Sequence, residues 1–465
     1  MEDMRVKEIV EATGGRLLCG DENRPVCHIC IDSRAVAAGD LFVPLVGEKV
    51  DAHRFLPQVT AQGAAAVLTS EHDQAEGETA WIRVKDTKQA LQDLGACYRN
   101  RLALPLVGIT GSVGKTTTRE MVATALSAGF QVFKTAGNLN SQVGVPMTLT
   151  ELTKADQIGV IELGMSEPGE LSVIARIARV NMAVITNIGI THIEQLGSQE
   201  NIYREKLCIQ DGMAEDGILF LNGDDPYLKE TKARDGRRTI YYGTGEHCDY
   251  RAVDITVKQG FPVFTAVHED QAVPVSLQVM GSHNILNAMA SLAVAAENGV
   301  SMEAAAKALA SYTGFQGRQQ IRHVKGMTVI DDTYNASPVS MKAGVEVLCS
   351  MAEEGRKIAV LADMKELGPD TVRFHQEVGS FIGERSLDAV FLLGDLAVGI
   401  GTGIREKNLD TELFYFSDRQ QLTQALSDYL QSGDHVLLKG SNSMKLGEVA
   451  ASICKEQETG ETIGV

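Results

Sequence analysis

The segment VGITGSVGKTTTREM, residues 107–121, limits the possible folds of this chain more than any other stretch. An apolar run leads into a glycine-rich turn and then into an amphipathic helix, which predicts a strand–loop–helix unit. Glycines in such a turn let backbone N–H groups point inward, where they and the start of the helix bind phosphate. The lysine would reach the β- and γ-phosphates of a nucleotide, and the threonine after it would hold Mg²⁺. The predicted nucleotide-binding residues are Gly111, Ser112, Val113, Gly114, Lys115, Thr116 and Thr117.

The loop departs at one position from the usual pattern G-x-x-x-x-G-K-[ST], because Ile109 stands where glycine is expected. The lysine and threonine keep their spacing, so we interpret the segment as a variant phosphate loop, with a chance glycine-rich turn as the alternative. The N-K-x-D motif of switch GTPases is absent from the sequence. A motor ATPase would end a neighbouring strand in Asp, whereas IGVIELGM ends in Glu162. That carboxylate could hold a cation beside the phosphates or be an ordinary strand end.

The alternation of apolar runs and amphipathic segments predicts an α/β protein of three domains. Residues 1–102 form a small α/β domain, and residues 103–314 a central parallel-sheet domain with the phosphate loop. The pattern of apolar and polar residues in 250–280 predicts antiparallel strands within that second domain. Residues 315–465 form a Rossmann-like domain that lacks G-x-G-x-x-G, so dinucleotide binding is disfavoured.

The net charge of the chain argues against two classes of binding partner. The net charge is −18, from 43 Lys and Arg against 61 Asp and Glu, which argues against nucleic acid and membrane surfaces as partners. The sequence has no apolar run of the roughly 18 residues needed to cross a bilayer, and its start does not look like a signal peptide. We expect a cytoplasmic protein with reduced cysteines. The pair Cys27 and Cys30 in VCHICID fits a strand better than a zinc site.

Six separated motifs, in order along the chain, resemble the Mur ligase family of ATP-dependent peptide synthetases of the bacterial cell wall. They are TGSVGKTT, ELGMSEPGE, ITNIGITHIEQLGS, SHNILNAMAS, GRQQI and IDDTYNASPVSM. Four further stretches are similar to the family members that add D-alanyl-D-alanine to a UDP-muramoyl tripeptide: KTAGNLNSQVGVPMTL, DDTYNASPVSMKA, LADMKELG and LLKGSNSMKLGEVA. The resemblance implies a monomeric enzyme that makes an amide bond through an acyl phosphate.

The resemblance also assigns the catalytic and metal-binding residues. It implies two Mg²⁺ ions held by Thr116, Glu162, His192 and a carbamate on Lys206, formed from CO₂. Lys115 completes the catalytic set. Without the resemblance, we would interpret His192 as a structural hydrogen-bonding residue and Lys206 as a solvated lysine on a helix.

For the nucleotide, the resemblance implies contacts from the second and third domains, with His283 and Asn287 as weaker candidates. Asn284 at a helix start would contact adenine, although an Asn there could equally cap the helix. Arginine supplies a fork for phosphate oxygens, and aspartate accepts from ribose hydroxyls. The residues from the third domain are Arg318, Asp332, Tyr334 and Asn335.

For the peptide substrate, the resemblance points to Ser33 and Arg34 at the uridine-diphosphate end and to Asn138 and Asn140. A turn with a local salt bridge is the alternative for the sequence DSR. One departure concerns the acceptor: Asn442 stands where family members often have Arg, and Lys439 and Lys445 are the nearby cations that could compensate.

Three other functions remain open at this point. Two are ligases of the same superfamily, the enzyme that adds the third residue and folylpolyglutamate synthase. The D-N-P-R motif typical of the former is absent, and the full first domain with its DSR motif favours a UDP-sugar over folate. The third is a regulatory P-loop ATPase stimulated by a protein partner.

Overall fold

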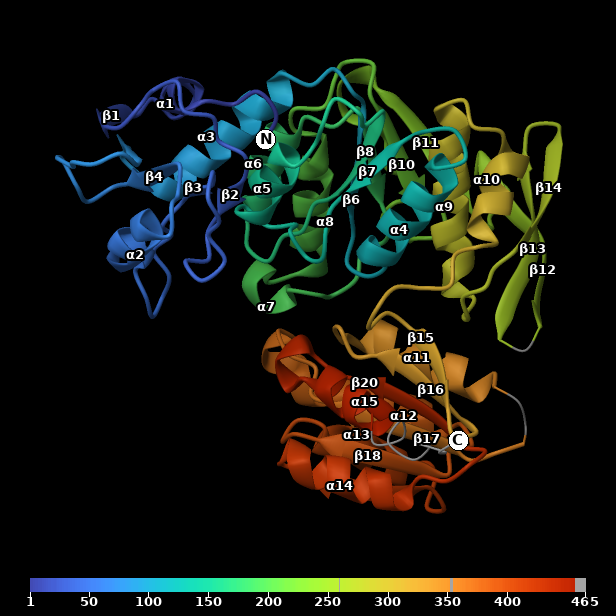
Figure 1. The fold of residues 1–465 in the computed structure, drawn as a ribbon. Helices are drawn as coiled ribbons and strands as arrows, with labels where there is room; N and C mark the ends of the chain where they lie inside the picture. The colour runs from blue at the N-terminus through green and yellow to red at the C-terminus, as the bar shows by residue number, and fades with distance from the viewer. Residues whose placement is uncertain (259, 352–353, 456–465) are drawn as a thin grey trace, which may run out of the picture.

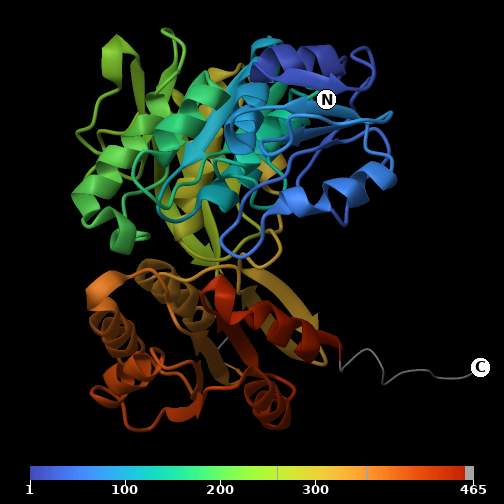
Figure 2. The same cartoon turned by 90° about the vertical axis from the view of Figure 1, so that its left-hand side faces the viewer.

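The computed structural model describes residues 1–258, 260–351 and 354–455. Three sheets of five, nine and six strands follow one another along the chain, which confirms the predicted three-part α/β fold. Figures 1 and 2 show the first two parts side by side and the third, in orange and red, packed below them. The predicted domain boundaries, after residues 102 and 314, both fall between helices and strands and stay predictions.

The first sheet has the order β1-β5-β4-β3-β2, in which only the β1–β5 pair is antiparallel. The apolar run LFVPLV gives only the two-residue strand β3, because Pro44 has no N–H to donate to a neighbouring strand. Cys30 lies in β2 and Cys27 just before it, and both are free thiols. The elements are α1 Val6–Thr13, β1 Arg16–Cys19, β2 Ile29–Cys30, β3 Leu41–Phe42, η1 Ala52–Phe55, α2 Leu56–Ala61, β4 Ala66–Thr69, β5 Ala80–Arg83 and α3 Thr87–Asn100.

The central sheet has the order β14-β13-β12-β11-β10-β9-β6-β8-β7. Its strands from β7 to β12 are parallel, and β12, β13 and β14 form the antiparallel extension that the sequence predicts. Strands of this sheet are β6 Leu106–Thr110, β7 Val132–Lys134, β8 Ile158–Glu162, β9 Met182–Ile185, β10 Ile218–Asn222, β11 Arg238–Gly243, β12 Tyr250–Lys258, β13 Phe261–His268 and β14 Gln271–Ser276. The helices are α4 Lys115–Leu126, α5 Gly144–Thr150, α6 Glu170–Ala178, α7 Ile193–Leu196, α8 Gln199–Leu207, η2 Cys208–Gln210, η3 Arg234–Gly236, α9 His283–Glu297 and α10 Met302–Leu309.

The third sheet has the order β15-β16-β20-β17-β18-β19 and is parallel except for β15. Its strands are β15 Gln320–Val324, β16 Met327–Asp332, β17 Lys357–Ala362, β18 Ala389–Leu393, β19 Glu412–Phe416 and β20 His435–Lys439. Its helices are α11 Pro338–Cys349, η4 Gly368–Asp370, α12 Thr371–Gly383, α13 Val398–Arg405, α14 Arg419–Tyr429, η5 Asn442–Met444 and α15 Leu446–Lys455.

The hydrophobic cores join the first two domains more firmly than the third. One continuous buried cluster runs from Leu91 of α3 to Leu149 of α5 and Ile174 of α6. At this junction Gly95 leaves no room for a side chain, since a Cβ there would lie 2.7 Å from Pro146. The third domain has two clusters, on the two faces of its sheet, and one of them also includes Met280 of the central domain. A separate core is what a domain needs to move as a body against the other two.

Candidate active site

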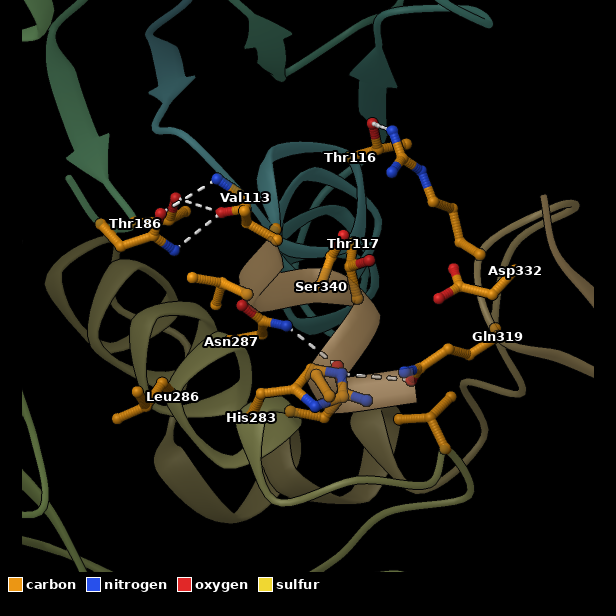
Figure 3. A pocket seen from close by; sticks show the side chains of 18 of the residues that line it. Val113, Thr116, Thr117, Thr186, His283, Leu286, Asn287, Gln319, Asp332 and Ser340 are labelled. Atoms are coloured by element: carbon orange, nitrogen blue, oxygen red, sulfur yellow. Dashed lines mark hydrogen bonds between the residues drawn. The ribbon is translucent and has the colours of Figure 1, made fainter. Parts of the chain in front are cut away.

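The phosphate loop leaves the carboxyl end of β6 in the middle of the central sheet. Gly111 has φ 149°, and a Cβ there would lie 1.8 Å from the hydroxyl of Thr186, so only glycine fits. The carbonyl of Val113 accepts from the Thr186 hydroxyl at 2.6 Å and from Asn187 Nδ2 at 2.9 Å. Asn187 Oδ1 accepts in return from the backbone N–H of Val113 at 2.9 Å. The adjacent strand β9 therefore fixes the loop from its own carboxyl end (Figure 3).

Lys115 begins α4 and folds back over the loop. Its Nζ donates to the carbonyl of Gly111 at 2.7 Å. Burial lowers the pKa of Lys115, whereas the charge of Glu162 acts in the opposite direction. The ammonium thus lies where nucleotide phosphates would replace backbone carbonyls as its partners.

The third domain reaches this loop through Arg318. Its Nη2 donates to the hydroxyl of Thr116 at 3.4 Å, and its guanidinium stacks 4.0 Å over the ring of Tyr334. Burial lowers the pKa of Arg318, and nearby Asp332 and Glu162 oppose this. The Nε of Arg318 is buried without a hydrogen-bond partner within the described residues. An unpartnered buried donor beside a phosphate loop is suited to an anionic ligand.

A cavity lies between the loop, the start of α9 and the third domain. Thr118 donates to Asn287 at 3.0 Å, and Asn287 donates to Asn284 at 2.9 Å. Asn284 itself donates to the carbonyl of Met280 at 2.7 Å, so its side chain does not cap α9. His283 lies 3.1 Å from Gln319, which joins α9 to the third domain across the cavity (Figure 3).

Sequence reasoning missed several residues that line this cavity. Asn187, Thr186 and Asn222 follow or end strands β9 and β10, and their only sequence signal was that position at the carboxyl ends of parallel strands. The others come from β11, α9, α11, β20 and the segments that precede α9 and β15, which the sequence does not bring together. The missed lining residues are Thr186, Asn187, Asn222, Tyr242, Val279, Leu286, Tyr312, Gly314, Gln319, Val339, Ser340, Ala343 and Lys439.

Asp332 and Lys439 form a buried pair at the edge of the cavity. The Nζ of Lys439 donates to Asp332 at 2.6 Å and to the carbonyl of Asn335 at 3.0 Å. Lys439 is 1% exposed, so contrary to the expectation from sequence it is not available to compensate for Asn442. Lys445 is the exposed cation of this segment.

Glu162 ends β8 and is 3% exposed. Its two oxygens accept from Arg119 at 3.2 Å and from Asn140 at 2.8 Å. Asn140 therefore touches the predicted metal ligand, whereas Asn138 is exposed in the same loop. The hydroxyl of Thr116 and the remaining lone pairs of Glu162 are oxygen donors of the kind that Mg²⁺ prefers, so this part of the site fits the ion.

Lys206 is buried in α8, at 2% exposure, and the reading as a solvated lysine is wrong. Its Nζ has no hydrogen-bond partner in the part of the chain that is described. Burial holds the pKa of Lys206 well below its usual range, and the charge of Lys115 lowers it further. A neutral amine is the form that reacts with CO₂, so the environment fits the predicted carbamate.

Two groups of predicted site residues lie apart from Thr116, Glu162 and Lys206. They are His192 and the pair of Ser33 and Arg34. His192 lines a smaller cavity with Lys115, Arg318, Asn335 and Ser337, and Glu162 is not among the residues that line this cavity. Within the described ranges the one close group of three potential metal ligands is Asp51, His53 and Glu71 of the first domain.

Ser33 and Arg34 line neither of the two cavities beside the phosphate loop. Arg34 is exposed and pairs with Asp32 at 2.8 and 2.6 Å, which is the turn with a local salt bridge that was the alternative for DSR. Ser33 is buried in the same turn.

Within the described residues, no helix is both long and apolar enough to cross a bilayer.

Known proteins match the whole chain. Residues 25–99 match the Mur ligase family catalytic domain, 109–295 the Mur ligase middle domain and 317–442 the Mur ligase glutamate ligase domain. A UDP-N-acetylmuramoyl-tripeptide–D-alanyl-D-alanine ligase of Bacillus subtilis is 37% identical over 96% of this chain and 98% of its own length. The Escherichia coli enzyme of that name is 33% identical over 93% and 94%.

Two crystal structures show the same arrangement. MurF from Acinetobacter baumannii superposes with a TM-score of 0.88 at 31% identity, covering 97% of this chain and 98% of its own. MurF from Thermotoga maritima in complex with ADP has a TM-score of 0.81 at 30% identity, covering 93% and 98%. By its sequence, its three domains and its phosphate loop, this chain belongs to the Mur ligase family.

Proposed function

We propose that this chain is an ATP-dependent ligase that adds D-alanyl-D-alanine to a UDP-N-acetylmuramoyl tripeptide. The products are the UDP-muramoyl pentapeptide, ADP and phosphate. Relatives with this activity in their name match between 93% and 99% of the chain at 28–37% identity. The observation that carries the proposal is the buried, unpaired Lys206 near Lys115. A regulatory ATPase has no use for an unpaired lysine buried there, whereas a carbamate ligand suits a ligase.

ATP would bind in the two cavities that meet at Gly114. The larger one, between the loop and α9, takes the nucleoside, with Asn284 and Asn287 beside the base and Asp332 beside the ribose. The phosphates lie along the loop, where Lys115 and Arg318 neutralise their charge. The Thermotoga maritima relative is known in complex with ADP, which supports nucleotide binding by this chain.

Magnesium would be held by Thr116 and Glu162, and by His192 with a carbamate on Lys206. When bound, it neutralises the charge that spreads over a transferring phosphoryl group. Arg119, fully buried, donates to Glu162 and keeps that carboxylate in place.

ATP solves a chemical problem, since a carboxylate and an amine do not condense in water. The terminal carboxylate of the tripeptide attacks the γ-phosphorus, and Lys115 and Arg318 stabilise the charge on the departing ADP. The free amine of D-alanyl-D-alanine then attacks the acyl phosphate, forms the amide and expels phosphate. Contact of the third domain with the phosphate loop excludes water from this intermediate.

The substrate residues follow from the same proposal. Asn138 and Asn140 lie on the loop between β7 and α5, and Asn140 contacts Glu162, where the reacting end of the tripeptide must arrive. Ser33 and Arg34 would receive the uridine diphosphate in the first domain, with Arg34 exchanging Asp32 for a phosphate. The predicted monomeric state and cytoplasmic location belong to this proposal and stay predictions.

The test mixes the protein with Mg-ATP, UDP-muramoyl tripeptide and D-alanyl-D-alanine and follows phosphate release and product mass. We expect phosphate and a pentapeptide only with both substrates, and neither from the variant K115M. Phosphate without a new amide would refute the proposal in favour of another ligase or a regulatory ATPase. A product with a free amino acid in place of the dipeptide would identify the enzyme that adds the third residue.

A further inference from the structure

A carboxylate of the third domain touches the predicted metal ligand His192. Glu366 lies in the loop after β17, and its Oε2 is 2.6 Å from Nδ1 of His192, just before α7 of the central domain. The side chain of His192 is 17% exposed and that of Glu366 is 49% exposed. The contact exists only when the third domain lies against the central one, as it does here.

Both residues have a backbone conformation that side chains rarely adopt. The φ angle is 65° at His192 and 63° at Glu366, in the left-handed region. Such a conformation is unfavourable for a non-glycine residue, so the surrounding structure has to hold it.

The loop of Glu366 is anchored inside the third domain. The backbone N–H of Met364 donates to His375 at 3.0 Å, and that of Lys365 donates to the hydroxyl of Ser441 at 2.9 Å. The domain thus presents Glu366 from a fixed loop instead of a free chain.

The contact determines which ring nitrogen of His192 keeps a lone pair that can bind a metal ion. The contact does not have the alignment of a hydrogen bond, and Nδ1 is buried without a hydrogen-bond partner among the described residues. A carboxylate can only accept, however, so its charge at this distance favours the proton on Nδ1 and leaves the lone pair on Nε2. Within the described residues no hydrogen-bond partner takes Nε2. Histidines that bind metals usually have a carboxylate or carbonyl on the other ring nitrogen, which fixes the ring and raises its basicity.

We propose that Glu366 is a positioning residue that sets the orientation and tautomer of His192 when the third domain docks. This inference rests on the proposed role of His192 as a metal ligand. Arg318 and Glu366 both come from the third domain and reach the phosphate loop and His192 respectively. Docking would therefore complete the phosphate contacts and the second metal position in one step.

The test compares E366A, E366Q and the control E377Q, with H192A as the reference for loss of the site. Glu377 is a partly exposed glutamate of the same domain whose one recorded ion pair is with Arg373 on its own helix, at 3.9 Å. Binding of Mn²⁺ in the presence of ADP is measured by electron paramagnetic resonance, together with kcat and KM of the ligase reaction.

We expect E366A to weaken Mn²⁺ binding by about 10–100-fold at the site that H192A removes. We also expect kcat to fall by a larger factor than the KM for tripeptide changes. E366Q, whose amide oxygen still accepts from Nδ1–H, should recover most of the loss, and E377Q should match the unaltered protein. Unchanged Mn²⁺ binding in E366A, with product formed normally, would overturn this inference alone. If H192A itself leaves Mn²⁺ binding unchanged, His192 is not a metal ligand and this inference is refuted with that role. Absence of any product from the unaltered protein would instead refute the proposed function.

Discussion

Replacing Lys439 by Met should destabilise the third domain by leaving a buried charge alone. Met matches the length of lysine but removes the ammonium that donates to Asp332 at 2.6 Å and to Asn335 at 3.0 Å. Asp332 is 6% exposed, so water cannot replace the lost partner. Breaking a buried pair from one side costs about 3–5 kcal/mol. Because Arg318 also lies near Asp332, we expect about 3 kcal/mol.

Differential scanning calorimetry measures the effect. For a domain of this size about 1 kcal/mol shifts Tm by roughly 2–4 °C, so K439M should unfold roughly 6–12 °C earlier. The double variant D332N/K439M, which removes both charges, should recover at least half of that shift. The control K445M removes a lysine that is 62% exposed and should change stability by less than about 0.5 kcal/mol. A Tm of K439M within about 2 °C of the unaltered protein, or a double variant no more stable than the single one, would refute the reasoning.

Three further predictions concern other buried groups. With ¹³C-labelled bicarbonate, the unaltered protein should show a carbamate signal by NMR that K206R lacks, because burial lowers the pKa of the Lys206 amine and so favours its reactive neutral form. A signal of equal size in K206R would place the carbamate elsewhere. R318K should weaken ADP binding about tenfold in calorimetry, since lysine cannot stack on Tyr334 and reach Thr116 together; unchanged binding would remove Arg318 from the site. His375 is buried, and burial lowers its pKa, so the unfolded chain takes up a proton first as pH falls below about 6.5. Stability should then drop by up to about 1.4 kcal/mol per pH unit, read from urea midpoints, and H375Q should show a shallower slope.

The sequence alone determined the class of the fold and the position of the phosphate loop. Both depend on local patterns: alternating apolar runs for the strands, and glycines 111 and 114 before Lys115 for the loop. The antiparallel strands in residues 250–280 could be predicted from the sequence in the same way.

Only the tertiary structure decided what the charged residues do. Lys206 reads as a surface lysine along its own helix, because the segments that bury it are distant in sequence. Lys439 looked free for a substrate until β16 and β20 paired and brought Asp332 beside it. Glu366 and His192 lie on different domains, so no spacing in the chain could reveal their contact. Local sequence sets the backbone, but solvation and pairing of a charge depend on long-range packing, which no local pattern records.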